Sequence, residues 1–378
     1  MRTIRFALAV LLTACILPSC QEKPGQEDDG LMTMKSVARA SYTSAKPEKG
    51  AKGDFSFTTD KMKLTTNSKG TNDSNEILHF NVKFPADHGA YRAAYLTYTM
   101  CATDNGPADW DQTTIVSIKD KRTGEWYELA RAFTPYGGSF SANWNKSWYM
   151  DVTEFLPLME GDTEFTLYYC GWEGDSAAKH HAVKLGFDFF EGKPEKNVIY
   201  TKKIYDSSKG SIPAYRRCWP YGIEGYSIED ASRLGERTIS IPAGVRSALV
   251  RVDITGHGMD YDGSFPDRAG YVLNSCAEFD YQNYYITFNG EKLKEHGKVF
   301  ETNGDNYEQA GTWWYDRAGW GPGKPANVQW WEIRNIPAEG ATVTLDFDFD
   351  RFNSSFTSPN EDSNPYYIIS TDIFGYDK

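Results

Sequence analysis

Short strand-like runs repeat along most of this chain, and they constrain its fold more than any other feature. In the clearest run, residues 343–352 (VTLDFDFDRF), apolar side chains alternate with aspartates. A period of two places the apolar side chains on a buried face of a strand and the carboxylates on its solvated face. Further runs, separated by Gly, Pro, Asn or Asp, occupy residues 77–84, 93–100, 163–169, 183–190, 249–254 and 284–288. Many short strands with turn signals predict an all-β sandwich or jelly roll.

Helical patterns of comparable length are missing from the sequence. Only residues 152–159 and 228–234 have the character of short helical turns. The composition agrees with β structure, since 15% of the residues are aromatic and such side chains suit pleated sheets and sugar-binding faces. A net charge of −12 argues against nucleic acid as a partner and against electrostatic binding to anionic membranes.

The N-terminus has the features of a targeting signal. A basic head with Arg2 and Arg5 precedes the apolar run 6–17, and Leu-Pro-Ser then leads to Cys20. This order resembles a bacterial lipobox, so we expect residues 1–19 to be a lipoprotein signal peptide and Cys20 to be the lipid attachment site. An ordinary secretory signal with a chance cysteine is the alternative. In either case the chain is exported, and the lipobox predicts anchoring in the outer membrane, with surface exposure left open.

Residues 20–52 are polar and are expected to form a flexible tether, because they offer too little apolar surface to fold. A polar Gly/Pro stretch at 192–196 then separates two strand-rich halves. We therefore expect an N-terminal β domain over 53–192 and a C-terminal β domain over 197–378.

Four cysteines remain beyond the signal region, at positions 101, 170, 218 and 276, and sequence alone leaves all three pairings open. The Cys and His residues do not have zinc-site spacing, so we expect neither a metal nor a cofactor.

Carboxylates beside aromatic rings are the remaining candidates for chemistry. Asp111 follows Trp110 at the head of two strand-like runs in the segment 109–136. Glu278 lies in the second half, and Arg317 opens a Gly-rich loop. Taken singly, such residues are usually turn residues or surface ion pairs.

Several ordered segments resemble the peptide-N-glycosidase F family, whose members release whole N-glycans from asparagine. The matching pieces are DWD at 109–111, KRTGEWYELARAFTPY at 121–136, DVT at 151–153, FD at 187–188, GKP at 192–194, ITG at 254–256, CAE at 276–278 and DRAGWGPG at 316–323. They cover most of residues 95–378. The resemblance implies two side-by-side eight-stranded antiparallel jelly rolls, with the site in the cleft between them.

By the same resemblance, Asp111 matches the principal catalytic aspartate and Glu278 the second essential carboxylate. Arg317 matches an arginine of the site, and Trp172 and Trp320 match indoles suited to packing on sugar faces. The implied reaction is hydrolysis of the β-aspartyl-glucosaminyl amide of an N-glycoprotein or N-glycopeptide. Carboxylates then activate water and protonate the nitrogen leaving group.

The chain departs from the family pattern at three places near this site. Cys170 replaces an acid, Gln112 replaces an arginine, and His257 replaces a tryptophan. We count His257, together with Trp110, among the candidate substrate-binding residues. Cysteines of the family's disulfides are also absent, including the partner of Cys276.

We expect a glycan-releasing amidase that acts as a monomer. One alternative is a surface glycan-binding lipoprotein of the same fold with impaired turnover, which the altered residues keep open. Another is a structural or adhesive surface protein. Retention of both Asp111 and Glu278 argues against that last reading, since a scaffold needs neither carboxylate.

Overall fold

The computed structural model describes residues 30–48, 53–66, 77–103, 105–206, 235–258, 277–279, 282–349 and 366–378. The described residues from Met32 onward belong to one compact unit, which does not include Gly30 and Leu31. Cys20, Cys218, Cys276 and the expected helical turn at 228–234 lie outside the described residues. Among the described residues, no helix has both the length and the apolar character needed to span a bilayer.

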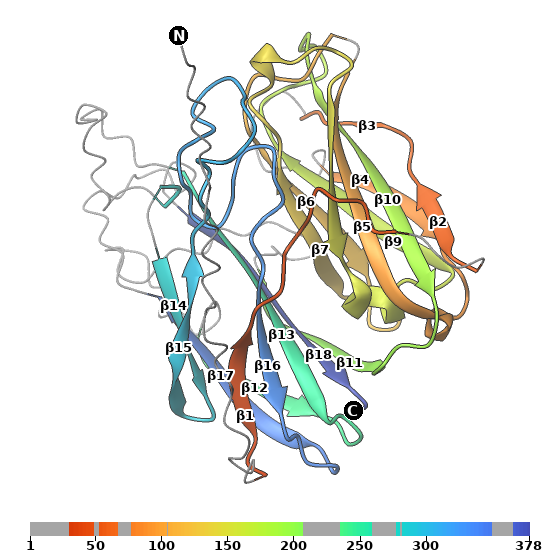
Figure 1. Ribbon diagram of the computed structural model, residues 1–378, viewed down its shortest axis with the longest axis vertical. Coiled ribbons are helices and arrows are strands. Elements are labelled where there is room, and N and C mark those ends of the chain that lie inside the picture. The colour runs from red at the N-terminus through yellow and green to blue at the C-terminus, as the bar shows by residue number, and fades with distance from the viewer. Residues whose placement is uncertain are drawn as a thin grey trace, which may run out of the picture. The chain divides into compact units, whose positions relative to one another are not determined.

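The first sandwich is built from two antiparallel sheets (Figure 1). One sheet has the order β2-β10-β5-β8, with β3 also paired to β10, and the other has the order β4-β9-β6-β7. The strands are β2 (Phe55–Thr58), β3 (Met62–Lys63), β4 (Ile77–Lys83), β5 (Tyr91–Ala102), β6 (Thr113–Lys119), β7 (Trp126–Phe133), β8 (Asn145–Asp151), β9 (Asp162–Cys170) and β10 (His181–Glu191). Its short 3₁₀ helices are η2 (His88–Ala90), η3 (Gly137–Ser139) and η4 (Thr153–Leu158). The helical turn expected at 152–159 is thus confirmed.

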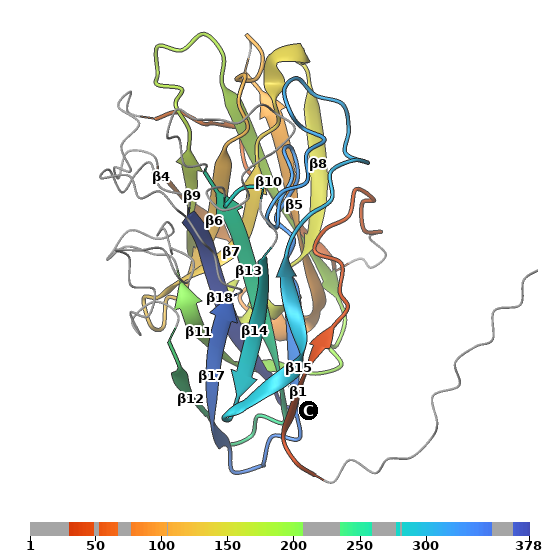
Figure 2. The same cartoon turned by 90° about the vertical axis from the view of Figure 1, so that its left-hand side faces the viewer.

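The second sandwich also has two antiparallel sheets, seen from another side in Figure 2. Their orders are β1-β16-β13-β18-β11 and β12-β17-β14-β15. The strands are β1 (Thr33–Val37), β11 (Val198–Asp206), β12 (Arg237–Ile241), β13 (Ser247–His257), β14 (Gln282–Phe288), β15 (Glu291–Val299), β16 (Gln329–Arg334), β17 (Ala341–Phe349) and β18 (Tyr366–Tyr376). The chain passes from one sandwich to the other between Glu191 and Val198.

The expected all-β class with antiparallel sheets is confirmed. Nine described strands form each sandwich, five in one sheet and four in the other. Without the two-residue β3 and the N-terminal β1, eight remain in each, the number that the family resemblance implies. Residues 343–349 of the alternating run predicted at 343–352 lie in β17, where Val343, Leu345 and Phe347 are buried and the residues between them are partly exposed. Residues 350–352 lie outside the described residues.

The flexible tether expected for residues 20–52 is wrong for residues 33–37. These residues form β1, which pairs antiparallel with the edge strand β16 from Thr33–Arg334 to Val37–Trp330. Met34 is the one buried side chain of β1 and packs into the core of the second sandwich. Backbone pairing to an existing sheet edge needs little apolar surface, and composition alone therefore missed it.

A buried polar network joins the two sandwiches. Arg131 on β7 is fully buried and donates to the Thr255 hydroxyl at 2.7 Å and to the Ile368 carbonyl at 3.0 Å, both in the second sandwich. It also forms ion pairs with Asp253 at 3.2 Å and with Glu128 at 2.9 Å. Such directional contacts, unlike apolar contacts, fix how one sandwich is placed against the other.

Candidate active site

Asp111 lies in a backbone segment that is fixed from both sides, immediately before β6. The hydroxyl of Thr134 donates to the Trp110 carbonyl at 3.2 Å and accepts from the Gln112 amide at 2.8 Å. His181 Nε2 lies 3.0 Å from the same Trp110 carbonyl. Burial lowers the pKa of His181 to about 4, so the ring is neutral near neutral pH and its N–H serves as the donor. The direction of the Asp111 side chain is therefore set by its backbone.

Arg317 is the centre of the site and comes from the second sandwich. Its side chain is fully buried. Nη1 donates to the carbonyls of Thr312 at 3.1 Å and Tyr315 at 2.9 Å, and Nη2 donates to the Tyr136 hydroxyl at 3.2 Å. Because these bonds come from several directions, the guanidinium plane has one orientation.

The two carboxylates singled out in the sequence both face this guanidinium. Arg317 Nε donates to Glu278 Oε1 at 3.2 Å, and Arg317 Nη2 lies 3.6 Å from Asp111 Oδ2. The Asp111 and Glu278 side chains are 10% and 19% exposed, so both are withdrawn from bulk water but still reachable. Asp111 Oδ2 is buried and has no hydrogen-bond partner among the described residues. The group placed against this oxygen is therefore the Arg317 guanidinium, at a distance longer than a hydrogen bond.

Burial, helped by the nearby charge of Glu278, raises the pKa of Asp111 to about 7, although Arg317 and a hydrogen bond from Tyr136 act in the opposite direction. A carboxyl group that titrates near neutral pH is suited to exchange a proton during a reaction. The pKa of Tyr136 is raised by burial and by the Asp111 charge, so its hydroxyl stays protonated.

Exposed indoles lie beside these charged groups. The Trp110 and Trp172 rings are 54% and 65% exposed and meet edge to face at 6.1 Å between centroids. Trp110 also meets the Tyr136 ring edge to face at 6.3 Å. Exposed indoles pack well against the apolar faces of sugars, so Trp110 and Trp172 have the exposure that their predicted role requires.

Sequence reasoning missed two residues of the site, Tyr136 and Thr312, which both contact the Arg317 guanidinium. It also passed over Trp314, an indole that is 47% exposed and meets the Tyr315 ring edge to face. Tyr136 closes the segment that carries the family resemblance, and Trp314 stands just before the DRAGW motif. Proximity to those motifs was the available signal.

Two of the predicted substrate contacts, Trp320 and His257, are wrong as surface contacts. Trp320 is 4% exposed, stacks on Phe133 at 4.3 Å and donates through Nε1 to the Gly256 carbonyl at 2.8 Å. His257 is 6% exposed, stacks on the same two rings and is hydrogen-bonded to the Thr255 hydroxyl at 2.7 Å. Trp320 instead supports the site from beneath, since its ring centre lies 4.9 Å from the Arg317 guanidinium carbon.

The acid that the family has at the position of Cys170 is not replaced by the nearby Glu173. Cys170 ends β9 opposite Thr113, two residues beyond Asp111. The carboxylate of Glu173 accepts from the Tyr169 hydroxyl and from the Trp172 amide, so it is bound within its own turn. Gln112 is buried; its carbonyl accepts from the Thr134 amide, and its amide donates to the Thr134 hydroxyl. Within the described part of the chain, no group of three or more His, Cys, Asp or Glu side chains is placed to bind a metal ion.

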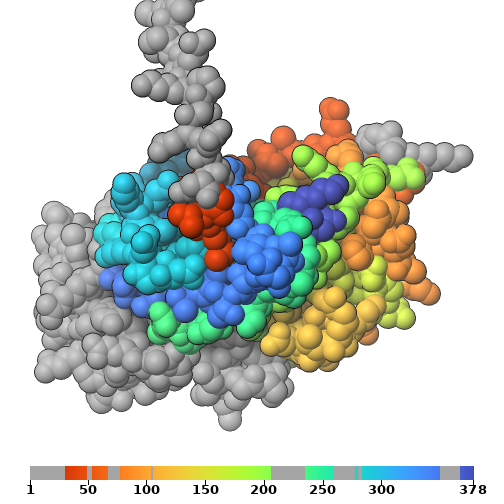
Figure 3. All heavy atoms as spheres, turned by 90° about the horizontal axis from the view of Figure 1, so that it is seen from below, coloured from red at the N-terminus to blue at the C-terminus, as the bar shows by residue number. Residues whose placement is uncertain are grey.

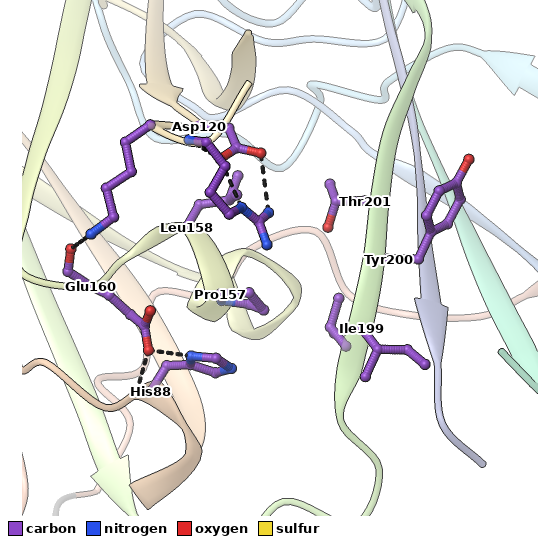
Figure 4. A pocket seen from close by; sticks show the side chains of 11 residues that line it. His88, Asp120, Pro157, Leu158, Glu160, Ile199, Tyr200 and Thr201 are labelled. Carbon is purple, nitrogen blue, oxygen red and sulfur yellow. Dashed lines mark hydrogen bonds and ion pairs between the residues drawn. The ribbon is translucent and has the colours of Figure 1, made fainter. Parts of the chain in front are cut away.

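A separate cavity of about 140 Å³ lies between the β6–β7 turn, the end of η4 and the start of β11 (Figure 4). Its charged groups are already paired, with His88 Nδ1 at 2.5 Å from Glu160 and Arg122 Nε at 3.0 Å from Asp120. None of the carboxylates or indoles of the candidate site lines it. We therefore assign no catalytic role to this cavity.

Fold and site together define a class of protein: a paired β-sandwich in which one buried arginine faces one carboxylate from each sandwich. Comparison with known proteins agrees with this class. No protein-family model matches the chain. The chain is 27% identical over 296 residues to peptide-N(4)-(N-acetyl-β-D-glucosaminyl)asparagine amidase F from Elizabethkingia miricola, covering 76% of this chain and 75% of that protein.

Solved structures give the same result for the fold. PNGase F, a glycosylasparaginase from Flavobacterium meningosepticum, superposes with a TM-score of 0.65 at 23% identity, covering 85% of this chain and 96% of that one. PNGF-II superposes with a TM-score of 0.56 at 15% identity, covering 91% of this chain and 65% of that one. The resemblance to the peptide-N-glycosidase F family stated from the sequence is therefore confirmed.

Proposed function

We propose that this protein is a peptide-N-glycosidase that hydrolyses the β-aspartyl-glucosaminyl amide bond of N-glycoproteins or N-glycopeptides. The observation that carries the proposal is the shared guanidinium of Arg317, which faces both Asp111 and Glu278 from opposite sandwiches. A purely structural protein gains little from two partly accessible acids held on one buried arginine, since burying such groups costs free energy. The similarity to an enzyme of this activity supports the same conclusion.

In the proposed reaction, water adds to the amide carbonyl carbon and the carbon–nitrogen bond breaks. The products are an aspartate in the peptide and a glycosylamine, which later loses ammonia. Asp111, whose pKa is raised to about 7 mainly by burial, accepts a proton from the water and returns it to the leaving nitrogen. Arg317 fixes Glu278 and Asp111 relative to each other, while Trp110 and Trp172 bind the sugar faces.

A second candidate is a glycan-binding protein of the same fold that no longer turns over its ligand. Cys170 and Gln112 favour it, because they remove one acid and one arginine from the family pattern, and the carboxylate of the nearby Glu173 is bound within its own turn. The exposed indoles serve binding equally well in both cases.

Incubation of purified residues 21–378 with a denatured N-glycoprotein decides between the two. The amidase releases free oligosaccharide, and peptide mass spectrometry finds Asp where the glycosylated Asn was. Retained glycopeptide binding without release would favour the second candidate. Loss of both binding and release would leave only a scaffold role.

We also propose that the protein is exported and lipid-anchored in the outer membrane through Cys20, acting as a monomer. The support is the lipobox-like order of the first 20 residues. Cys20→Ser should move the protein from the membrane fraction to the soluble fraction, and unchanged fractionation would contradict the anchor.

A further inference from the structure

The segment from Thr33 to Thr43, here called the N-terminal strap, contacts both sandwiches. Its first part, β1, pairs with β16 of the second sandwich. Its last residue, Thr43, exchanges two backbone hydrogen bonds of 2.9 Å with Tyr149 on β8 of the first sandwich. Figure 3 shows the start of the strap lying on the surface formed by β15 and β16. The strap is therefore a structured connection between the two halves of the site.

Arg39 anchors the middle of the strap. Its guanidinium forms ion pairs of 2.8 Å with Asp151 and with Glu154, both from the first sandwich. The same group lies 4.4 Å from the ring centre of Trp330 on β16. A bidentate arginine stacked on an indole has little freedom, so residues 40–43 are held in one place.

Tyr42 reaches the backbone that carries Arg317. Its hydroxyl donates to Glu301 at 3.0 Å. The backbones of Glu301 and Arg317 form a two-way bridge, with N–O distances of 2.7 and 3.0 Å. The Tyr42 ring also packs edge to face on Trp148 at 5.2 Å, and Trp148 donates to the Gly323 carbonyl at 2.7 Å. Tyr42 thus contacts partners that hold the Arg317 loop in two places.

Ser41 reinforces the same loop. Its hydroxyl bonds to the Val328 carbonyl at 2.9 Å, accepts from the Val328 amide at 2.9 Å and lies 3.0 Å from Asn327 Oδ1. The Asn327 amide in turn donates to the Gly319 carbonyl, two residues beyond Arg317. The strap is thereby hydrogen-bonded to segments on both sides of the arginine.

We propose that Tyr42 is a positioning residue for the site: through Glu301 it fixes the guanidinium of Arg317 against Asp111 and Glu278. Tyr42 does not touch the reacting atoms in this role. The consequence for turnover rests on the proposed amidase function, whereas the consequence for the geometry of Arg317 does not.

The test compares Tyr42→Phe with a matched control, Tyr200→Phe. The first variant keeps the ring on Trp148 and loses only the bond to Glu301. The control loses a tyrosine hydroxyl bond to the Ser240 carbonyl on β12, among residues that do not contact Arg317. Two quantities are measured, the titration of Asp111 by carboxyl-selective NMR and the steady-state release of glycan. Ser41→Ala is measured in parallel, so that a folding defect in one variant does not remove the test.

We expect kcat of Tyr42→Phe to fall roughly tenfold while KM changes less than about twofold, because the defect lies in positioning and not in substrate contact. The Asp111 titration should move upward by roughly half a pH unit, since a displaced Arg317 attracts the carboxylate less. The groups facing Asp111 that set this titration are Arg317, Glu278 and Tyr136. Tyr200→Phe should change neither quantity.

An unchanged Asp111 titration in folded Tyr42→Phe and Ser41→Ala would overturn the proposal, as would equal changes in the Tyr200→Phe control. If the parent protein releases no glycan, the proposed function fails, but the titration still decides the role of Tyr42 by itself. A shifted titration with unchanged kcat would also overturn the positioning role.

Discussion

The substitution Asp111→Asn tests two effects of this aspartate separately: its effect on the free energy of unfolding and its effect on glycan release. Asparagine has nearly the shape of the protonated aspartate but carries no charge at any pH. In the parent protein, burial raises the pKa of Asp111 from 3.8 to about 7. The folded state therefore holds a proton that the unfolded chain releases at a much lower pH. We expect the variant to lose glycan release and to gain stability at neutral and alkaline pH.

The stability gained by the variant depends on pH, because the pKa of Asp111 differs between the folded and the unfolded chain. Below about pH 4 the carboxyl is neutral in both states and the substitution has little effect. Between about pH 4 and 7 the unfolded chain ionises Asp111 while the folded protein does not, so the free energy of unfolding of the parent falls as pH rises. A difference of about 3 pKa units corresponds to about 4 kcal/mol, which the variant regains once the pH is above 7.

The assay is urea unfolding of parent and variant at pH 4, 6 and 8, followed by fluorescence. Asp109→Asn is the control, because Asp109 is a neighbouring aspartate that is 64% exposed and pairs only weakly with Lys179 at 3.5 Å. The stability difference between Asp111→Asn and the parent should grow by about 2 to 4 kcal/mol from pH 4 to pH 8. A difference that stays constant with pH, or shrinks, would refute the burial argument, and full activity in the variant would refute the catalytic role of Asp111.

Two further substitutions test other parts of the molecule. Trp172→Ala should raise KM for glycopeptides roughly tenfold and leave the melting temperature nearly unchanged, because the exposed ring contacts ligand more than core; kinetics and calorimetry check this. Arg131→Met should lower the free energy of unfolding by about 3 to 5 kcal/mol, because Glu128 loses its buried ion-pair partner and Asp253 keeps only Arg251. Urea unfolding at pH 7 measures this loss. A loss below about 1 kcal/mol would show that the interdomain network is not held by this arginine.

The local pattern of apolar residues was enough to predict strands with a buried face, but it did not predict the strand β1 that pairs at the edge of a sheet. The run that became β17 has its buried face encoded in every second residue. By contrast, β1 has the sequence TMKSV with one buried side chain, and its pairing with β16 depends on an edge formed 300 residues later. Backbone hydrogen bonds form whatever the side chains are, so the amino-acid composition does not indicate a strand of this kind.

The charged part of the site was predictable, and part of the aromatic shell was not. Asp111, Glu278 and Arg317 were found through their motifs, and they converge on one another in the structure. Trp320 and His257 were counted among the substrate-binding residues because they stand at positions where the family has tryptophans. Their burial depends on Phe133, which reaches them from the other sandwich at the end of β7. Sequence spacing does not reveal such a contact.

The burial of Trp320 changes how selectivity and turnover are divided between the two sandwiches. Trp110, Trp172 and Asp111 come from the first sandwich, so two of the exposed indoles and the aspartate with the raised pKa lie on the same sandwich. The second sandwich supplies Glu278 and Arg317, with Trp320 beneath the guanidinium. Changes at the exposed indoles then act mainly on ligand affinity. Changes that shift one sandwich against the other act on the distance from Arg317 to Asp111, and so on turnover.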